Sequence, residues 1–147
     1  MSSALPDVNV LVALAWPNHV HHGAVRRWFR KQGRNGWATC AITEVGFVRV
    51  SMNSGIVGEA VSALEAEALL EQFRAIGEHE YWRELPRLSE LRAGFLPHLV
   101  GHRQVTDAFL LQLAADRGGR LATLDRRLRE LASLAGYPAG TVELIEP

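Results

Sequence analysis

The sequence has very little cysteine, almost no lysine and no long hydrophobic run. Its single cysteine, Cys40, excludes an intrachain disulfide, so the hydrophobic core alone must hold the fold together. Cys40 stands among apolar residues and no motif marks it as a nucleophile, so we interpret it as a small buried side chain. Sequences this poor in cysteine are typical of a reducing compartment, and we expect a cytoplasmic protein.

The N-terminal region lacks the features of a secretory signal, because no basic stretch precedes an apolar run and a small-residue cleavage site. The longest apolar stretch, residues 8–16, is interrupted by Asn9 and is too short to cross a bilayer. We therefore expect neither secretion nor a membrane partner.

The charge of the chain is balanced, with 16 basic and 16 acidic residues. Proteins that bind nucleic acid generally through bulk electrostatics are basic, so this balance argues against that class. It still permits an enzyme in which a local basic rim surrounds an acidic centre.

The length and composition fit one globular domain over residues 1–147, with 48% hydrophobic and 22% charged residues. Short apolar segments alternate with helical patterns along the chain. We expect strands at 5–7, 37–40, 79–82, 120–123 and 141–145, and helices at 9–16, 19–32, 43–52, 57–76, 86–94, 106–117 and 126–135. Such alternation predicts an α/β fold with three layers, in which helices cover both faces of a mostly parallel sheet of about five strands.

Aspartate is rare, and its positions are informative. Only four of the 16 acidic residues are aspartates, and three of them, Asp7, Asp107 and Asp125, adjoin expected strands or helix starts. Asp7 ends the first strand, Asp125 follows the 120–123 strand, and Glu44 opens the helix after the second strand. Carboxyl ends of parallel strands share one edge of a sheet, so we expect these acids to converge there. Asp107 joins them only if the helix that Thr106 is expected to cap begins near that edge.

Each acid also has an ordinary structural explanation. An acid in the first turn of a helix favourably meets the helix dipole, which accounts for Glu44 and Asp107. An aspartate after a strand is common in turns, which accounts for Asp7 and Asp125. As a set, however, four converging carboxylates repel one another, and no lysine lies near them in sequence. A divalent cation would offset that repulsion, and all-oxygen ligands favour Mg²⁺, Mn²⁺ or Ca²⁺ over zinc.

Four segments of the chain, in order, resemble the acidic motifs of PIN-domain nucleases. They are residues 5–14 (LPDVNVLVAL), 42–49 (ITEVGFVR), 105–114 (VTDAFLLQLA) and 119–126 (GRLATLDR). No single motif is specific, but the four in order, with a closing strand at 142–145, cover the whole chain. The resemblance is greatest to VapC-type toxins of bacterial type II toxin–antitoxin modules.

This resemblance implies a PIN fold and an Mg²⁺- or Mn²⁺-dependent endoribonuclease that hydrolyses RNA to 5′-phosphate and 3′-hydroxyl ends. It assigns catalysis and metal binding to four carboxylates, Asp7, Glu44, Asp107 and Asp125. It assigns Asn9, Thr106 and Thr123 to supporting the ligands or orienting the substrate. It also implies a homodimer and a cognate antitoxin that blocks the acidic pocket.

Several other residues bear on function less directly. Arg126 and Arg127 directly follow Asp125, where they either form an ordinary solvated helix face or contact RNA phosphates or carboxylates of an antitoxin. We interpret the histidine-rich segment 18–22 as the polar start of a helix. His22 is a further candidate for contact with the substrate or an antitoxin at the rim of the pocket. We interpret Asp116 as a solvated surface residue and the four tryptophans as packing residues.

Two other functional classes stay open at the level of sequence. One is a PIN-like module that binds RNA or protein without catalysis; the intact set of four acids argues against it. The other is a metal-dependent phosphatase or DNA nuclease, because acidic metal sites serve several phosphoryl chemistries. The chain has no extra DNA-binding segment, and activity on RNA against duplex DNA would separate the alternatives.

Overall fold

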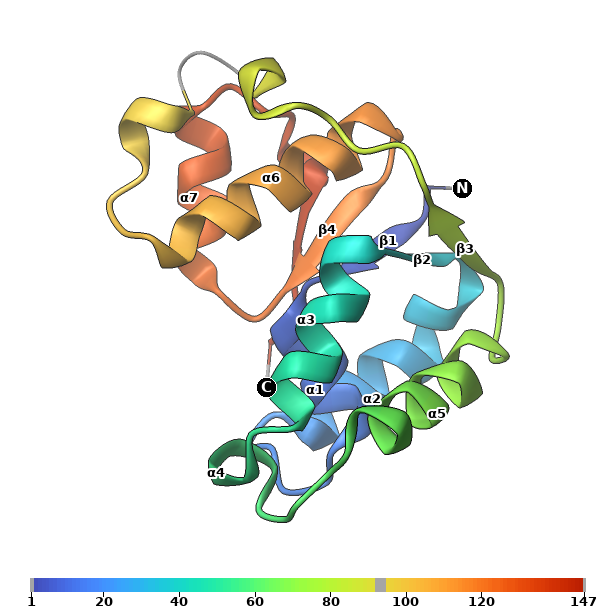
Figure 1. The fold of residues 1–147 in the computed structure, drawn as a ribbon. Helices are drawn as coiled ribbons and strands as arrows, with labels where there is room; N and C mark the ends of the chain where they lie inside the picture. Colours follow the sequence, from blue (N-terminus) through green and yellow to red (C-terminus); the bar gives the residue numbers. More distant parts are fainter. Residues whose placement is uncertain (1, 92–94, 147) are drawn as a thin grey trace.

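The computed structural model describes residues 2–91 and 95–146 and has a five-stranded central sheet (Figure 1). The strands are β1 Ala4–Pro6, β2 Trp37–Cys40, β3 His79–Trp82, β4 Arg120–Thr123 and β5 Val142–Leu144. Their order across the sheet is β3-β2-β1-β4-β5, and every neighbouring pair is parallel. The predicted α/β class with a parallel sheet is therefore confirmed.

Helices join the strands in the alternating order expected for parallel connections. They are α1 Val8–Ala15, α2 His22–Lys31, α3 Ala41–Ser51, α4 Ser54–Val57, α5 Ala63–Arg74, α6 Arg103–Asp116 and α7 Arg126–Leu134. In the described ranges, short 3₁₀ helices lie at η1 Gly33–Asn35, η2 Leu88–Glu90, η3 Leu96–His98 and η4 Ala139–Thr141.

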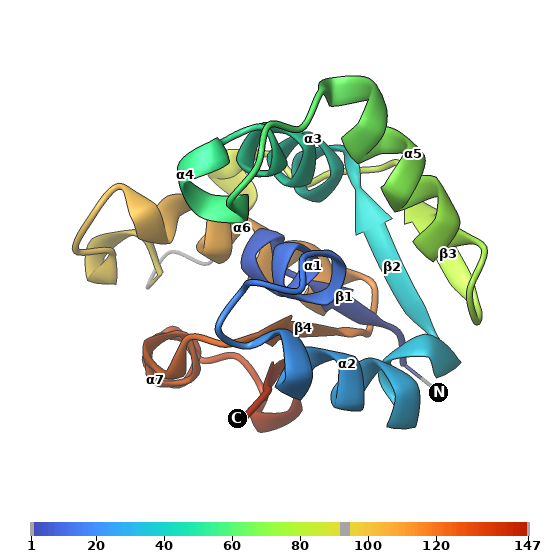
Figure 2. The same ribbon diagram turned by 90° about the horizontal axis from the view of Figure 1, so that it is seen from below.

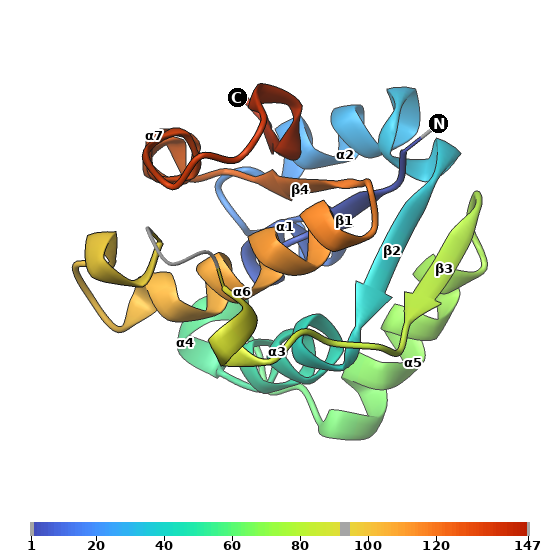
Figure 3. The same ribbon diagram turned by 90° about the horizontal axis from the view of Figure 1, so that it is seen from above.

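The sheet separates two hydrophobic clusters, because alternate strand residues point to opposite faces. Ala4 and Ala122 belong to one cluster with residues of α1, α2, α3 and α5. Leu5 and Leu121 belong to the other, with residues of α6 and α7. Figure 2 shows α1 and α2 in front of the sheet, and Figure 3, from the opposite side, shows α6 over β1 and β4. Both faces of the sheet are thus covered.

The strand order reverses next to β1. The chain runs outward from β1 to β2 and β3, then returns to place β4 on the other side of β1, with Leu5 opposite Leu121 and Pro6 opposite Ala122. Ligand sites of open parallel sheets form where the order reverses, outside the carboxyl ends of the strands. The residues that follow β1 and β4 therefore lie where a ligand site is expected.

Three helix predictions differ from the structure. The expected helix over 57–76 is interrupted, because Gly58 adopts a left-handed conformation after α4 and Ser62 opens α5 with a capping box that includes Glu65. The helix expected to start at Thr106 starts at Arg103, so Thr106 is not its cap. Of the helix expected over 86–94, the described part contains only η2, and residues 92–94 lie outside the described residues.

Within residues 2–91 and 95–146, no helix combines the length and the apolar character needed to cross a bilayer.

Gly77 makes the turn into β3 and gives a testable prediction about the fold. Its φ is +69°, and a Cβ atom there would lie 2.1 Å from the carbonyl oxygen of Arg34, which accepts the backbone N–H of Glu78. We expect Gly77→Ala to lower the free energy of unfolding by about 2–4 kcal/mol, combining left-handed strain with a backbone clash. Urea denaturation measures this loss.

Gly118 provides the matched control for this prediction. Its φ of +65° is similar, but a Cβ atom there would meet no other atom within 4 Å. Gly118→Ala should therefore cost only the conformational strain, about 1–2 kcal/mol. Equal losses in the two variants would show that the close approach at Gly77 is unimportant.

Candidate active site

One pocket at the carboxyl edge of the sheet brings together three of the four predicted acids. It lies where the strand order reverses, and residues of α1, α3 and α6 line it along with the residue that precedes α7. The lining residues are Asp7, Val8, Asn9, Val12, Arg49, Val50, His102, Thr106, Asp107 and Asp125. Asn9 and Thr106, which were predicted to support the site, are among them.

Asp7 is the most deeply buried acid of the pocket, with 5% of its surface exposed. It caps α1: its Oδ1 accepts the backbone N–H of Val10 at 2.9 Å, and its Oδ2 accepts the hydroxyl of Thr123 at 2.7 Å. Burial raises the pKa of Asp7 to about 6; the bonds from Thr123 and Val10 oppose this rise, and the charge of Asp125 adds to it. The sequence placed Asp7 here because it directly follows β1.

Thr123, the last residue of β4, connects two of the acids. Its hydroxyl donates to Asp7 and accepts the backbone N–H of Asp125 at 3.1 Å. Thr123 therefore links the ends of β1 and β4, and its predicted role in supporting metal ligands or orienting the substrate stays a prediction.

Asp107 lies in the second turn of α6 and is partly buried. Burial, together with the negative charges of Asp7 and Asp125, raises its pKa to about 7. Among the described residues, no hydrogen bond or ion pair to a protein group holds its carboxylate. Asp107 is therefore the acid whose charge the protein itself stabilises least.

Asp125 caps α7 at the outer side of the pocket. Its Oδ1 accepts the backbone N–H of Arg127 at 3.0 Å, and the guanidinium Nε of Arg127 lies 3.3 Å from the same oxygen. Arg127 thus contacts a pocket acid directly, while Arg126 is exposed at the start of α7 and does not line the pocket. The predicted contacts of both arginines with RNA or an antitoxin stay predictions.

The structure does not place Glu44 with the three aspartates. Its carboxylate accepts the hydroxyl of Thr39 at 2.5 Å and pairs with the guanidinium of Arg74 at 3.1 Å. Arg74 lies on α5 and also pairs with Glu67 and Glu71. The absence of lysine near the acids in sequence favoured a divalent cation as their counterion, but for Glu44 the distant Arg74 supplies the positive charge.

The α3 residue that packs against α1 next to Asp7 is Gly46. A Cβ atom at Gly46 would lie 2.5 Å from Cγ2 of Val8, so the two helices touch closely at this point. Glu44 lies two positions earlier on α3, and residues two apart on a helix face different directions. Helix geometry therefore explains why Glu44 lies outside the pocket.

His22 is the other candidate that the structure places elsewhere. Its Nδ1 lies 2.7 Å from the carbonyl oxygen of Ala13, and it does not line the acidic pocket. The ring secures the start of α2 against α1, so the rim contact predicted for His22 does not fit its position. Arg49 on α3 and His102, just before α6, also line the pocket. The sequence did not predict them, because it does not show how α3 and α6 pack around the acids.

The donor set of the pocket fits a hard divalent cation in its chemistry. Three carboxylates share one pocket, and the pKa of Asp107 is raised partly by the other two, so they face one another closely enough to repel. In the described part of the chain, no three His, Cys, Asp or Glu side chains lie close enough together to hold a metal ion without moving. Binding Mg²⁺ or Mn²⁺ would therefore draw these oxygen donors closer together.

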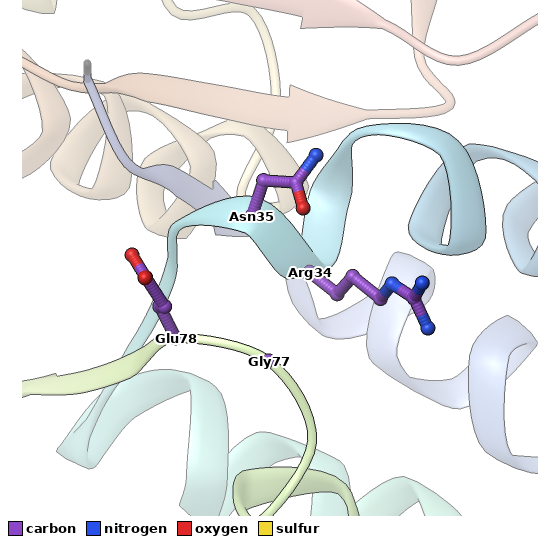
Figure 4. Close-up of a pocket in the computed structure, with 4 residues that line it drawn as sticks. All are labelled: Arg34, Asn35, Gly77 and Glu78. Atoms are coloured by element: carbon purple, nitrogen blue, oxygen red, sulfur yellow. The ribbon is translucent and has the colours of Figure 1, made fainter.

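A second hollow lies at the opposite, amino edge of the sheet, between η1 and the turn before β3. Arg34, Asn35, Gly77 and Glu78 line it, and Figure 4 shows the side chains of Arg34 and Glu78 pointing away from each other. It holds one carboxylate and one guanidinium, with no cluster of acids. The acidic pocket is thus the better candidate for phosphodiester chemistry.

The fold and site together define a class: a parallel α/β domain with an aspartate pocket at the point where the strand order reverses. The sequence matches the PIN domain family over residues 4–134. The chain therefore belongs to the PIN-domain family, which confirms the resemblance carried by its acidic motifs.

Two relatives from Mycobacterium tuberculosis (strain ATCC 25618 / H37Rv) are similar over nearly the whole chain. Ribonuclease VapC39 is 44% identical over 143 residues, which cover 97% of this chain and 99% of the relative. Ribonuclease VapC38 is 45% identical over 142 residues, which cover 97% of each chain. These similarities confirm the VapC type within the PIN-domain family.

A solved structure shows the same fold at much lower sequence identity. The crystal structure of PAE2754 from Pyrobaculum aerophilum aligns with a TM-score of 0.58 and 20% identity, covering 96% of this chain and 83% of that one. At this identity the likeness supports the fold alone.

Proposed function

We propose that this protein is a metal-dependent endoribonuclease that hydrolyses RNA phosphodiester bonds. The observation that carries the proposal is the meeting of Asp7, Asp107 and Asp125 in one pocket at the reversal of the strand order. The names of the relatives, which are ribonucleases, agree with it. A nuclease needs concentrated negative charge to bind a divalent cation, and this pocket supplies it.

The three aspartates would hold Mg²⁺ or Mn²⁺, which supplies Lewis-acid charge toward the phosphate oxygens and the attacking water. Thr123 and the N-terminus of α1 keep the Asp7 carboxylate in one orientation. Arg49 at the rim provides positive charge for the phosphates that flank the cleaved bond. Asn9 and Thr106 provide polar contacts for the substrate inside the pocket.

We further propose that the protein is the toxin of a type II toxin–antitoxin module in the cytoplasm, acting as a homodimer. Its VapC-type relatives support this assignment. A cognate antitoxin would inhibit it by covering the pocket, and the three acids favour a cationic group on the inhibiting segment.

The function is tested by titrating Mg²⁺ or Mn²⁺ into a broad cellular RNA pool with the wild type and with Asp7→Asn. We expect the metal to switch on cleavage in the wild type, and the variant to lose about 100-fold or more of the rate, because a neutral amide binds a hard cation poorly. Asparagine also caps helices well, so the variant should stay folded, which circular dichroism verifies.

The alternatives predict different results in the same assay. Folded, metal-loaded wild type that cuts no RNA would leave a non-catalytic binding module as the better explanation. Metal-dependent cleavage of duplex DNA, or release of phosphate from monoesters, without RNA cleavage would favour a DNA nuclease or a phosphatase.

A further inference from the structure

Asn9 is the one neutral amide among the polar side chains that line the acidic pocket. It lies in the first turn of α1, two residues after Asp7, and its side chain is exposed. Its Oδ1 lies 2.9 Å from Nε2 of His19, in the loop between α1 and α2. This contact determines whether the oxygen or the NH2 group of the Asn9 amide faces the pocket.

The hydrogen bonds of His19 fix where its ring proton sits. The backbone N–H of His21 donates to Nδ1 of His19 at 3.0 Å, so Nδ1 carries a lone pair and not a proton. In a neutral imidazole the proton is then on Nε2. Nε2–H therefore donates to Oδ1 of Asn9, which settles the orientation of the amide from chemistry.

The electrostatics of the loop agree with a neutral ring. Burial lowers the pKa of His19, and the neighbouring His21 and His22 lower it further. A protonated His19 would also lose the bond from His21, because Nδ1 would become a donor.

The position of His19 is set by its own loop and does not depend on Asn9. The backbone N–H of His19 donates to the carbonyl of Trp16 at 3.1 Å, and its carbonyl accepts the N–H of His22 at 3.0 Å. The ring of His22 then ties the loop to Ala13 of α1 at 2.7 Å. The imidazole is therefore a fixed donor against which Asn9 aligns.

We propose that His19 is a positioning residue for RNA cleavage: it holds the oxygen of Asn9, so that the amide N–H groups of Asn9 are presented to a non-bridging oxygen of the substrate phosphate. The proposal rests on the ribonuclease function proposed above. The Asn9 amide nitrogen donates to no protein group among the described residues. The oxygens of a phosphate only accept hydrogen bonds. The opposite orientation of the amide would therefore place Oδ1 of Asn9 against a phosphate oxygen, in a pocket that already holds three carboxylates.

The first test compares His19→Ala with His19→Gln in the metal-dependent RNA cleavage assay. We expect His19→Ala to lower kcat about 10-fold with little change in KM, because the contact is strongest when charge builds on the phosphate. His19→Gln should recover most of this loss, since its amide N–H can donate to Asn9. His21→Ala is the matched control, because His21 acts on His19 through its backbone N–H and should keep kcat near that of the wild type.

A double-mutant cycle checks that His19 acts through Asn9. In the Asn9→Ala background, His19→Ala should lower kcat no further, because the group it positions is already absent. Independent losses in the two variants, or a loss in His19→Gln as large as in His19→Ala, would overturn the proposal.

The ring tautomer of His19 provides a readout that needs no activity. Nitrogen-15 NMR of the wild type should show a protonated Nε2 and an unprotonated Nδ1 for this residue. The opposite tautomer would overturn the proposal even if the RNA assay succeeds. A wild type that cuts no RNA but shows the expected tautomer would instead contradict the ribonuclease function and leave the His19–Asn9 bond standing.

Discussion

Asp107→Asn is expected to stabilise the metal-free protein at pH 8 and, at the same time, to lower metal-dependent RNA cleavage about 100-fold or more. Asp107 is partly buried, faces two other carboxylates and has no protein donor among the described residues, so its negative charge destabilises the folded state. A neutral amide of nearly the same shape removes that cost. Catalytic and binding groups commonly reduce stability in this way.

The sign of the pH dependence follows from the direction of the shift. The pKa of Asp107 is raised from 3.8 to about 7 in the folded protein, and that of Asp7 from 3.8 to about 6. Between pH 4 and 7 the folded state therefore binds protons that the unfolded chain has lost. The free energy of unfolding should fall as the pH rises through this window and stay low at pH 8.

Thermal unfolding in EDTA at pH 5 and pH 8 measures the effect. Allowing for solvent screening of a partly exposed group, we expect Asp107→Asn to gain roughly 2 kcal/mol over the wild type at pH 8, or about 4–8 °C in Tm. Much less gain is expected at pH 5, where the wild-type carboxyl is largely protonated. Adding Mn²⁺ at pH 8 should raise the Tm of the wild type more than that of the variant.

Asp116 supplies the control on the same helix. It is exposed at the end of α6, where its carboxylate accepts the side-chain amide of Gln112 at 2.7 Å. Asp116→Asn should give no gain at pH 8 and no loss of cleavage. If Asp107→Asn unfolds at the same temperature as the wild type at pH 8, the repulsion inferred for the pocket is absent.

We expect Arg74→Met, which removes the cation that α5 provides to Glu44 of α3, to lower the free energy of unfolding by about 2–4 kcal/mol. Arg74 is 15% exposed and joins Glu44, Glu67 and Glu71, so its removal leaves three carboxylates close together without their cation. The loss comes mainly from Glu44, whose side chain is only 21% exposed and would keep a poorly solvated charge beside two other carboxylates. Urea denaturation at neutral pH measures the loss.

Glu67→Gln is the matched variant for this network. The Glu67 side chain is 48% exposed and pairs with the same arginine, so neutralising it should cost less than about 1 kcal/mol. A loss in Arg74→Met no larger than in Glu67→Gln would show that the network contributes little to stability.

Glu44→Gln then separates the structural role of Glu44 from the metal-binding role that the family resemblance implies. Glutamine keeps one oxygen for Arg74, and its amide N–H can donate to the hydroxyl of Thr39, so the variant should fold and should cut RNA within about threefold of the wild type. A well-folded Glu44→Gln that loses about 100-fold of the cleavage rate would instead place Glu44 among the metal ligands.

Much of the fold was predictable because its signals are local. The strands at 37–40, 79–82 and 120–123 have the predicted bounds, since short β-forming segments are flanked by glycines and helices. Asp7 and Asp125 were found by a rule about sheets, because a residue after a parallel strand must lie at its carboxyl edge. Thr123 was predicted only from the resemblance to PIN-domain nucleases.

The rest depends on contacts between distant parts of the chain. The pairing of Glu44 with Arg74 joins α3 to α5, and no pattern near Glu44 indicates it. The placement of Asp107 depends on how α6 packs against β1 and β4, and α6 starts without a side-chain cap that would reveal its first residue. The break between α4 and α5 was readable from Gly58 and the Ser62 capping box, but the run of strong helix formers in α5 obscured it.

The reversal of strand order also sets when the pocket can exist during synthesis. Asp7 is made first, but its partner Thr123 and its neighbour Asp125 come from β4 and the residues after it, in the last fifth of the chain. Until β4 arrives, β1 has one unpaired edge and Asp7 has no hydroxyl donor. A nascent chain that ends before Asp125 therefore has an incomplete pocket, and the site can assemble only after β4 and Asp125 have left the ribosome.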